Sequence, residues 1–174
     1  MPHGSHTVIQ HACEVGRWEL TSALPPPELR RYVVEYIGWF EHMTAPLCRR
    51  EPPTEIIPLI INFGAPVRIF DPAQPTRWTD FDSFITGSFD TYALVGSAGP
   101  SGGLQINFTI LGARVSLNRP LAALTNLVVS LEDVIGPAAG RLIGQLREAP
   151  TWDARFHLLG HQRPVCQLSG QQRY

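Results

Sequence analysis

The positions of the histidines limit the metal chemistry open to this chain. The sequence contains six histidines, which are His3, His6, His11, His42, His157 and His161. A metal enzyme built on strands commonly uses two histidines one residue apart, with a carboxylate and a later histidine, and no His-x-His pair occurs here. His157 and His161 have the four-residue spacing that places two ligands on one helical face. Because Gly160 is expected to end that helix and no third ligand is evident, we interpret both as solvent-facing and predict no metal site.

Nucleophilic groups are similarly sparse. The GSAG segment at residues 96–99 lacks the G-x-S-x-G spacing of a nucleophile elbow and is interpreted as a hairpin connection. Cys48 stands beside Arg49 and Arg50, neighbours that favour redox chemistry of a thiol, although a solvated loop cysteine is the simpler interpretation. All 14 basic residues are arginines, which excludes lysine chemistry, and the three cysteines form no C-x-x-C pair. The sequence therefore predicts no catalytic residue, no cofactor and no enzyme.

Short strands dominate the first two thirds of the chain. Alternating or β-branched apolar residues predict strands at residues 17–21, 33–40, 56–63, 67–70, 84–89, 92–95 and 104–110. The segments 44–54 and 71–82 contain prolines and are predicted to be loops. Because about seven strands precede a run of helices, the predicted class is α+β, with an antiparallel barrel or sandwich. Closure into a barrel would hide the strand edges.

Two of these strands carry polar residues on one face. Asn107 alternates with the apolar residues Ile106 and Phe108, and Asn62 alternates with Ile61 and Phe63. The apolar faces predict a shared core of Leu59, Ile61, Phe63, Leu104, Ile106 and Phe108. The polar faces either meet water, which we favour, or line a cavity that orients a small ligand. For the second alternative, the predicted ligand-binding residues are Trp39, Asn62, Phe63, Arg68, Tyr92 and Asn107.

The last third of the chain has the punctuation of short helices. Gly136 and Pro137 separate two of them, and Thr151 is expected to cap the last. Residues 137–147 place four apolar side chains on one helical face at three- and four-residue spacings. This face is either buried within the subunit or available to a second copy. In the second alternative, the predicted dimer-interface residues are Ala139, Leu142, Ile143 and Leu146.

Composition narrows the functional class further. The 174 residues suffice for one domain, of which 44% are hydrophobic and 17% charged, with a net charge of −1. Residues 1–103 carry 7 arginines against 11 acids, and residues 104–174 carry 7 against 4. Neither part concentrates arginine into the basic stripe that duplex DNA requires. No apolar run approaches 18 residues and no signal-peptide core is present, which predicts a cytoplasmic protein with no membrane contact.

Several segments, taken in order, resemble a known family. They are RWELTSALPPPELRRYVVEYIGWFEH, EIIPLIINFGAPVRI, FITGSFDTYALVGSAG, INFT-LGA, RPLAALTNLVVSLEDVIG and APTWDARFHLLG, which together span residues 17–161 approximately. These segments look like the N-terminal, non-DNA-binding domain of a branch of AraC-family transcription regulators from high-GC bacteria. Ile110 stands where that family usually has proline. After Gly160 the family continues into helix-turn-helix units, whereas this sequence continues HQRPVCQLSGQQRY.

This resemblance implies an effector-sensing and dimerisation domain built on a small cupin-like antiparallel β-barrel, followed by a cluster of short helices. The expected organisation is a flexible N-terminus over 1–12, a single regulatory domain over 13–161 and a tail over 162–174. Within the domain, 13–110 would form the barrel and 111–161 the helices.

The resemblance also implies partners. We expect a homodimer, or a heterodimer with a full-length paralogue, and a small-molecule effector. DNA would be contacted only through a helix-turn-helix domain that this sequence lacks. The alternative is a free-standing cupin-like small-molecule-binding protein or enzyme.

Overall fold

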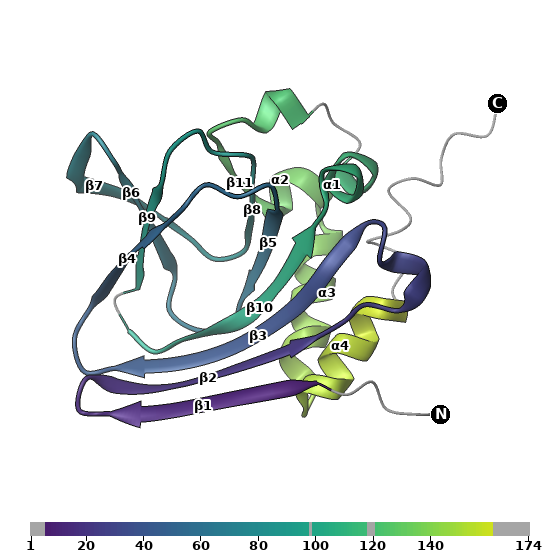
Figure 1. Cartoon of the computed structure of the whole chain (residues 1–174), viewed down its shortest axis with the longest axis horizontal. Coiled ribbons are helices and arrows are strands. Elements are labelled where there is room, and N and C mark those ends of the chain that lie inside the picture. Colours follow the sequence, from purple (N-terminus) through teal and green to yellow (C-terminus); the bar gives the residue numbers. More distant parts are fainter. Residues whose placement is uncertain (1–5, 98, 118–120, 162–174) are drawn as a thin grey trace.

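A computed structural model describes residues 6–97, 99–117 and 121–161 of the chain (Figure 1). The strands are β1 (Thr7–Cys13), β2 (Gly16–Ala23), β3 (Val33–Met43), β4 (Leu47–Glu51), β5 (Ile57–Asn62), β6 (Val67–Asp71), β7 (Gln74–Phe81), β8 (Phe84–Thr86), β9 (Ala93–Ser97), β10 (Ser101–Phe108) and β11 (Val128–Ser130). The α-helices are α1 (Ile110–Leu117), α2 (Leu131–Ile135), α3 (Ala138–Glu148) and α4 (Trp152–His161). Two short 3-10 helices, Pro27–Leu29 and Leu121–Leu124, connect these elements.

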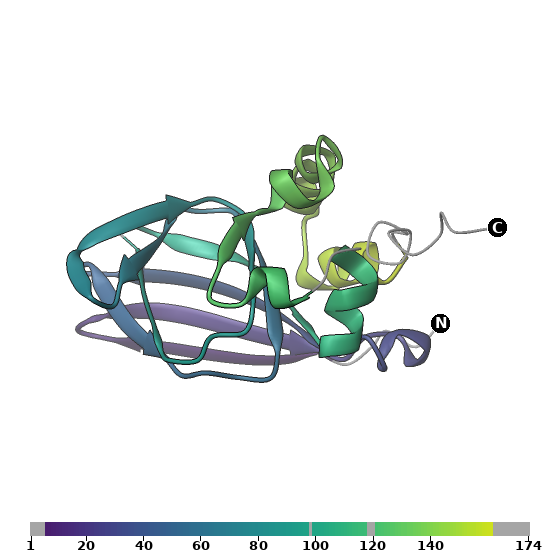
Figure 2. The same cartoon turned by 90° about the horizontal axis from the view of Figure 1, so that it is seen from above.

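The strands form two antiparallel sheets that face each other. The first sheet has the order β1-β2-β3-β10-β5-β8-β11, and the second has the order β4-β9-β6-β7. Figure 2 shows the helices gathered on one side of the strands. The predicted α+β class, with antiparallel strands followed by short helices, is confirmed. The two sheets share no hydrogen-bonded strand pair among the described residues, so the barrel is open along its seams rather than closed as expected.

The main core lies between the first sheet and the helices. Leu104, Ile106 and Phe108 of β10 are at most 1% exposed and pack in one cluster with side chains of α3 and α4. Leu59 and Ile61 of β5 belong to the same cluster, as the alternation of these strands predicted. The sixth predicted core residue, Phe63, is half-buried at the edge of this cluster.

Helices α3 and α4 are held by polar contacts as well as by packing. Thr151 caps α4 as predicted, because its hydroxyl accepts a hydrogen bond from the Ala154 amide at 3.2 Å. The Arg155 side chain donates to the Leu146 carbonyl at 3.0 Å, at the end of α3, and its guanidinium lies 4.7 Å from the Trp152 ring. Partial burial lowers the pKa of Arg155 from its usual value. The Trp152 indole in turn donates to Glu19 of β2 at 2.9 Å.

Four segments differ from the sequence predictions. Residues 7–12, expected to be flexible, belong to strand β1, which pairs along its whole length with β2. The expected loops 44–54 and 71–82 contain β4 and β7, and β11 lies inside the region expected to be helical. In each case the strand forms because a neighbouring strand supplies its hydrogen bonds, a non-local effect that local composition does not reveal. The expected tail over 162–174 lies outside the described residues.

The four residues predicted for a dimer interface are core instead. Ala139, Leu142 and Leu146 of α3 are at most 4% exposed, and Ile143 packs against the same cluster. The apolar face of α3 is therefore buried within the subunit, where it covers the apolar faces of β5 and β10.

No described helix is long and apolar enough to span a membrane.

Candidate functional site

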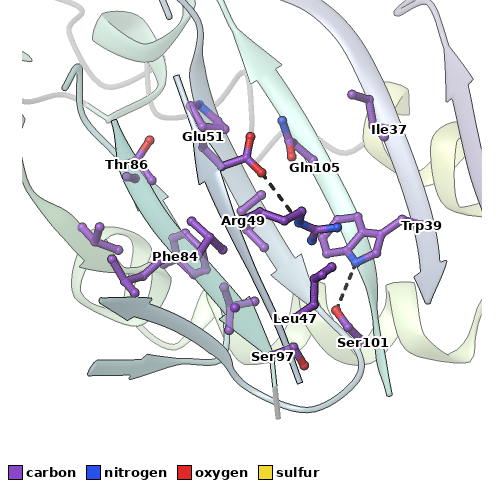
Figure 3. A pocket seen from close by; sticks show the side chains of 18 of the residues that line it. Ile37, Trp39, Leu47, Arg49, Glu51, Phe84, Thr86, Ser97, Ser101 and Gln105 are labelled. Carbon is purple, nitrogen blue, oxygen red and sulfur yellow. Dashed lines mark hydrogen bonds and ion pairs between the residues drawn. The ribbon is translucent and has the colours of Figure 1, made fainter. Parts of the chain in front are cut away.

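The candidate site is a cavity of about 510 Å³ between the two sheets (Figure 3). Its walls are the inner faces of β3 and β10 on one side and of β4, β6 and β9 on the other. The cavity volume lies within the range of known small-molecule sites. Most of the lining side chains are apolar, and the charged ones are Glu19 of β2, Glu41 of β3 and Arg49 and Glu51 of β4.

Strand alternation decides which side chains reach this cavity. In β10 the residues that alternate with the helix-facing Leu104 and Ile106 point the other way, so Ser101 and Gln105 line the cavity. In β3 the helix-facing side chain is Tyr36, which stacks on Phe156 of α4 at 6.0 Å, while Ile37 and Trp39 face the cavity. One face of the central strands therefore supports the helices and the opposite face forms the site.

The apolar wall of the cavity is a second, smaller cluster. Ile60, Val67 and Phe84 are its buried members, and Trp39 packs against them. The Trp39 indole donates a hydrogen bond to the Ser101 hydroxyl at 3.2 Å (Figure 3). Gly103 makes this placement feasible, because a Cβ atom at that position would lie 2.6 Å from the Trp39 ring. The ring is thus held across β10 with its apolar faces available to the cavity.

The polar end of the cavity is an ion-pair group that joins the two sheets. Arg49 of β4 donates two hydrogen bonds to the Glu41 carboxylate of β3, at 2.9 and 3.1 Å. The Glu41 side chain is only 10% exposed, whereas Arg49 is 47% exposed. Glu51, two residues further along the same face of β4, lies 3.8 Å from Arg49 Nε (Figure 3). Because its contact to the largely buried Glu41 carboxylate is bidentate, the Arg49 guanidinium is held in place by Glu41.

Of the six residues predicted to bind a ligand, Trp39 alone lines the cavity. Asn62 is completely buried and organises the turn after β5, where its side chain donates to the Gly64 and Ala65 carbonyls at 3.3 and 2.8 Å. Phe63 packs against the main core and the Arg155 guanidinium, 5.3 Å from its ring. The prediction that Asn62 and Phe63 line the cavity is wrong because β5 ends at Asn62, so the alternation of its side chains does not continue to Phe63.

The other three predicted residues make contacts within their own sheet. Arg68 pairs with Asp80 at 3.0 Å, and Tyr92 lies beneath the Arg50 guanidinium at 4.2 Å. Asn107 is 4% exposed and donates to Glu35 at 3.0 Å while it accepts from Gln105 at 2.7 Å. The interpretation that this polar face of β10 meets water is therefore wrong: Gln105 faces the cavity and Asn107 is buried in a hydrogen-bond network.

Sequence reasoning missed the ion-pair group because residues 44–54 were assigned to a loop. The signal was present in the alternation of β4, where Leu47, Arg49 and Glu51 face the cavity. Arg50, which alternates with them, stacks on Tyr92 outside the cavity. A strand was difficult to recognise there because the flanking prolines and paired arginines are typical of loops.

The structure also places the residues that the sequence offered for metal binding or nucleophilic chemistry. Helix α4 continues to His161, so Gly160 does not end it as expected. Within the described ranges, no group of three or more His, Cys, Asp or Glu side chains is arranged to hold a metal ion. The donor set of the cavity, two carboxylates bound to one guanidinium, does not suit the divalent metal of a histidine-based barrel enzyme. Cys48 is exposed. Ser97 bonds to the Gly99 carbonyl in a connection between the two sheets, not in the expected hairpin, because β9 and β10 belong to different sheets.

Comparison with known proteins gives a distant likeness. A crystal structure of the Lactobacillus farciminis oxalate decarboxylase formate complex is similar over 76% of this chain and 47% of that chain, with 13% sequence identity and a TM-score of 0.34. This chain therefore corresponds to about half the length of that protein. No protein-family model matches the sequence. No curated protein matches it either.

Proposed function

We propose that this domain binds a small, largely apolar molecule between its two sheets. The observation that carries the proposal is the 510 Å³ cavity, which is lined by Trp39 and a cluster of aliphatic and aromatic side chains. Binding sites of this kind combine an apolar wall with a few oriented polar groups. Here Ser101, Gln105 and the Glu41–Arg49 pair are those polar groups.

The test uses 1-adamantanemethanol, a compact apolar probe that does not absorb where tryptophan emits. Trp39 lies in the cavity and Trp18 at its edge, so binding should change the intrinsic fluorescence in a saturable way. For a probe of this size we expect a dissociation constant below about 1 mM. Ala93→Phe places a ring in the cavity and should abolish the change. Leu94→Phe, on the next residue of β9 and outside the lining, is the matched control. Absence of saturable binding to the native chain would contradict the proposal.

We further propose that ligand binding serves regulation, as in the sensor domain of an AraC-type transcription regulator. Two observations support this role. The sequence resembles such domains over most of its length, and the cavity and the helices lie on opposite faces of the same strands. Gly38, for example, contacts the Trp152 ring of α4, while its neighbours Ile37 and Trp39 face the cavity. A ligand that moves β3 would therefore act directly on α4.

Hydrogen exchange tests the regulatory role. Saturation with 1-adamantanemethanol should change amide protection in α3 and α4 as well as in the strands that line the cavity. Protection confined to the lining strands, with the helices unchanged, would count against regulation and leave the binding proposal intact.

We also propose that two copies associate through strand β1 rather than through α3. All seven residues of β1 are exposed, and in the part of the chain that the structure describes no strand pairs with its outer edge. The strand contains no proline, lysine or acidic residue that would oppose pairing. Antiparallel pairing of β1 with its copy would continue the sheet across a two-fold axis and cover Val8 and Ile9.

A further inference from the structure

Building on the proposed binding function, we infer that the cavity selects an apolar ligand with a protonated amine and rejects one with a carboxylate. The inference follows from the charges at its polar end. Four ionisable residues contribute to the lining, and they are Glu19, Glu41, Arg49 and Glu51. Glu19 is engaged on the other face of its sheet. Of the three that remain only Arg49 is a cation, so the polar end of the cavity carries a net negative charge at neutral pH.

The single cation is not available to an anionic ligand. Arg49 makes both of its short hydrogen bonds to Glu41, whose side chain is 10% exposed. A ligand carboxylate that captured the guanidinium would leave the Glu41 carboxylate largely buried without its partner. That exchange is unfavourable, because an unpaired charge in such a position loses solvation without compensation. Arg49 therefore orients Glu41 and links the sheets instead of acting as an anion receptor.

Glu51 is the carboxylate that remains accessible. Its side chain is 54% exposed, and its contact to Arg49 Nε is long, at 3.8 Å. It stands on the cavity face of β4, opposite the wall that carries Gln105 (Figure 3). Glu19, by contrast, accepts from the Trp152 indole and from Gln10 on the other face of its sheet. An ammonium group at the polar end of the cavity would contact Glu51 while the apolar body of the ligand lies against Trp39.

The neighbouring arginines Arg50 and Arg68 do not neutralise the negative charge at the polar end of the cavity. Arg50 points to the outer face of β4, where it stacks on Tyr92 at 4.2 Å. Arg68 is paired with Asp80 at 3.0 Å and stacks on Trp78. Neither residue contributes to the cavity lining. The selectivity therefore depends on Glu51 and on the committed state of Arg49.

Three probes with one apolar body measure the selectivity. They are 1-adamantanemethanol, 1-adamantanemethylamine and 1-adamantanecarboxylate, titrated into the native chain at pH 7 and low salt with the tryptophan signal as readout. We expect the amine to bind about 5- to 10-fold more tightly than the alcohol, and the carboxylate probe to bind more weakly than the alcohol. The factor is modest because the Glu51 side chain is about half exposed to solvent. The preference for the amine should decrease with added salt.

Glu51→Gln should bring the ratio of amine to alcohol affinity close to one. Glu55→Gln, a nearby carboxylate outside the lining, should keep the native ratio. If the alcohol binds but the amine binds no more tightly, the inference is overturned and the binding function stands. Tighter binding of the carboxylate, or a full amine preference in Glu51→Gln, also overturns it. If none of the probes binds, the binding function itself fails.

Discussion

Arg49 and Glu41 join the two sheets through a two-point ion pair, with N–O distances of 2.9 and 3.1 Å between β4 and β3. The strands that carry them are not hydrogen-bonded to each other. This pair therefore bridges the open seam beside the cavity, and it combines a largely buried carboxylate with a half-exposed guanidinium.

The cost of breaking this pair is the first prediction. Arg49→Met should lower the free energy of unfolding by about 1–3 kcal/mol, between the values for exposed and buried ion pairs, because Glu41 is left uncompensated. Adding Glu41→Gln in the same chain should recover part of the loss. Urea unfolding of the two single variants and the double variant measures the coupling. Strictly additive losses would show that the two groups do not interact appreciably.

The two faces of β10 give the second prediction. Phe108→Ala should cost about 3–5 kcal/mol, because this side chain is 1% exposed in the main core. Asn107→Ala should cost about 1–2 kcal/mol, because it removes hydrogen bonds to Gln105 and Glu35. Denaturant unfolding compares them directly. A larger loss for the asparagine variant would contradict this order.

Three glycines give a matched set for the third prediction. A Cβ at Gly140 or Gly144 in α3 has nothing within 4 Å, so an alanine at either position should stabilise the chain by about 0.5–1 kcal/mol. A Cβ at Gly38 would lie 2.4 Å from the Trp152 ring, and Gly38→Ala should therefore destabilise the chain by about 1–3 kcal/mol. Thermal unfolding of the three variants checks the opposite signs. A neutral Gly38→Ala would mean that α4 does not pack on β3 as described.

A buried hydroxyl gives the fourth prediction. Thr21 is completely buried, and its hydroxyl has no hydrogen-bond partner within the described part of the chain. Thr21→Val keeps the shape and removes the desolvated polar group, so it should raise the free energy of unfolding by about 1 kcal/mol. Thr21→Ser, which keeps the hydroxyl and removes a methyl group, is the control and should destabilise. Loss of stability in the valine variant would reveal a partner for the hydroxyl.

The last prediction separates the two surfaces considered for dimerisation. Ile9→Lys should convert a native dimer into a folded monomer, because a lysine on an edge strand opposes pairing. Leu142→Arg should instead unfold the subunit, since that side chain is 4% exposed in the core. Sedimentation equilibrium at about 100 μM, with circular dichroism as a check of folding, distinguishes them. A native chain that stays monomeric, or a folded monomer of Leu142→Arg, would contradict the β1 interface.

Local pattern was sufficient to predict much of the fold. The period-two alternation in residues 104–108 indicated a strand and identified Leu104, Ile106 and Phe108 as one face. Gly136 and Pro137 marked the boundary between α2 and α3, and Thr151 marked the start of α4. These features depend on residues within one or two turns of each other, so the sequence contains them directly.

The tertiary structure alone decided where the second face of each strand points. Nothing near Gln105 or Asn107 in the sequence indicates that a second sheet lies opposite β10, so the alternatives of water and cavity could not be separated. The pairing of β1 with β2 and of β4 with β9 was hidden for the same reason. An edge or half-exposed strand owes its stability to the hydrogen bonds of a partner strand. The residues of β9 that pair with β4 lie 42 to 50 residues away along the chain, as in Glu51↔Ala93 and Leu47↔Ser97. Only the packing of the two sheets against each other therefore brings Arg49, Glu41 and Trp39 together in one site.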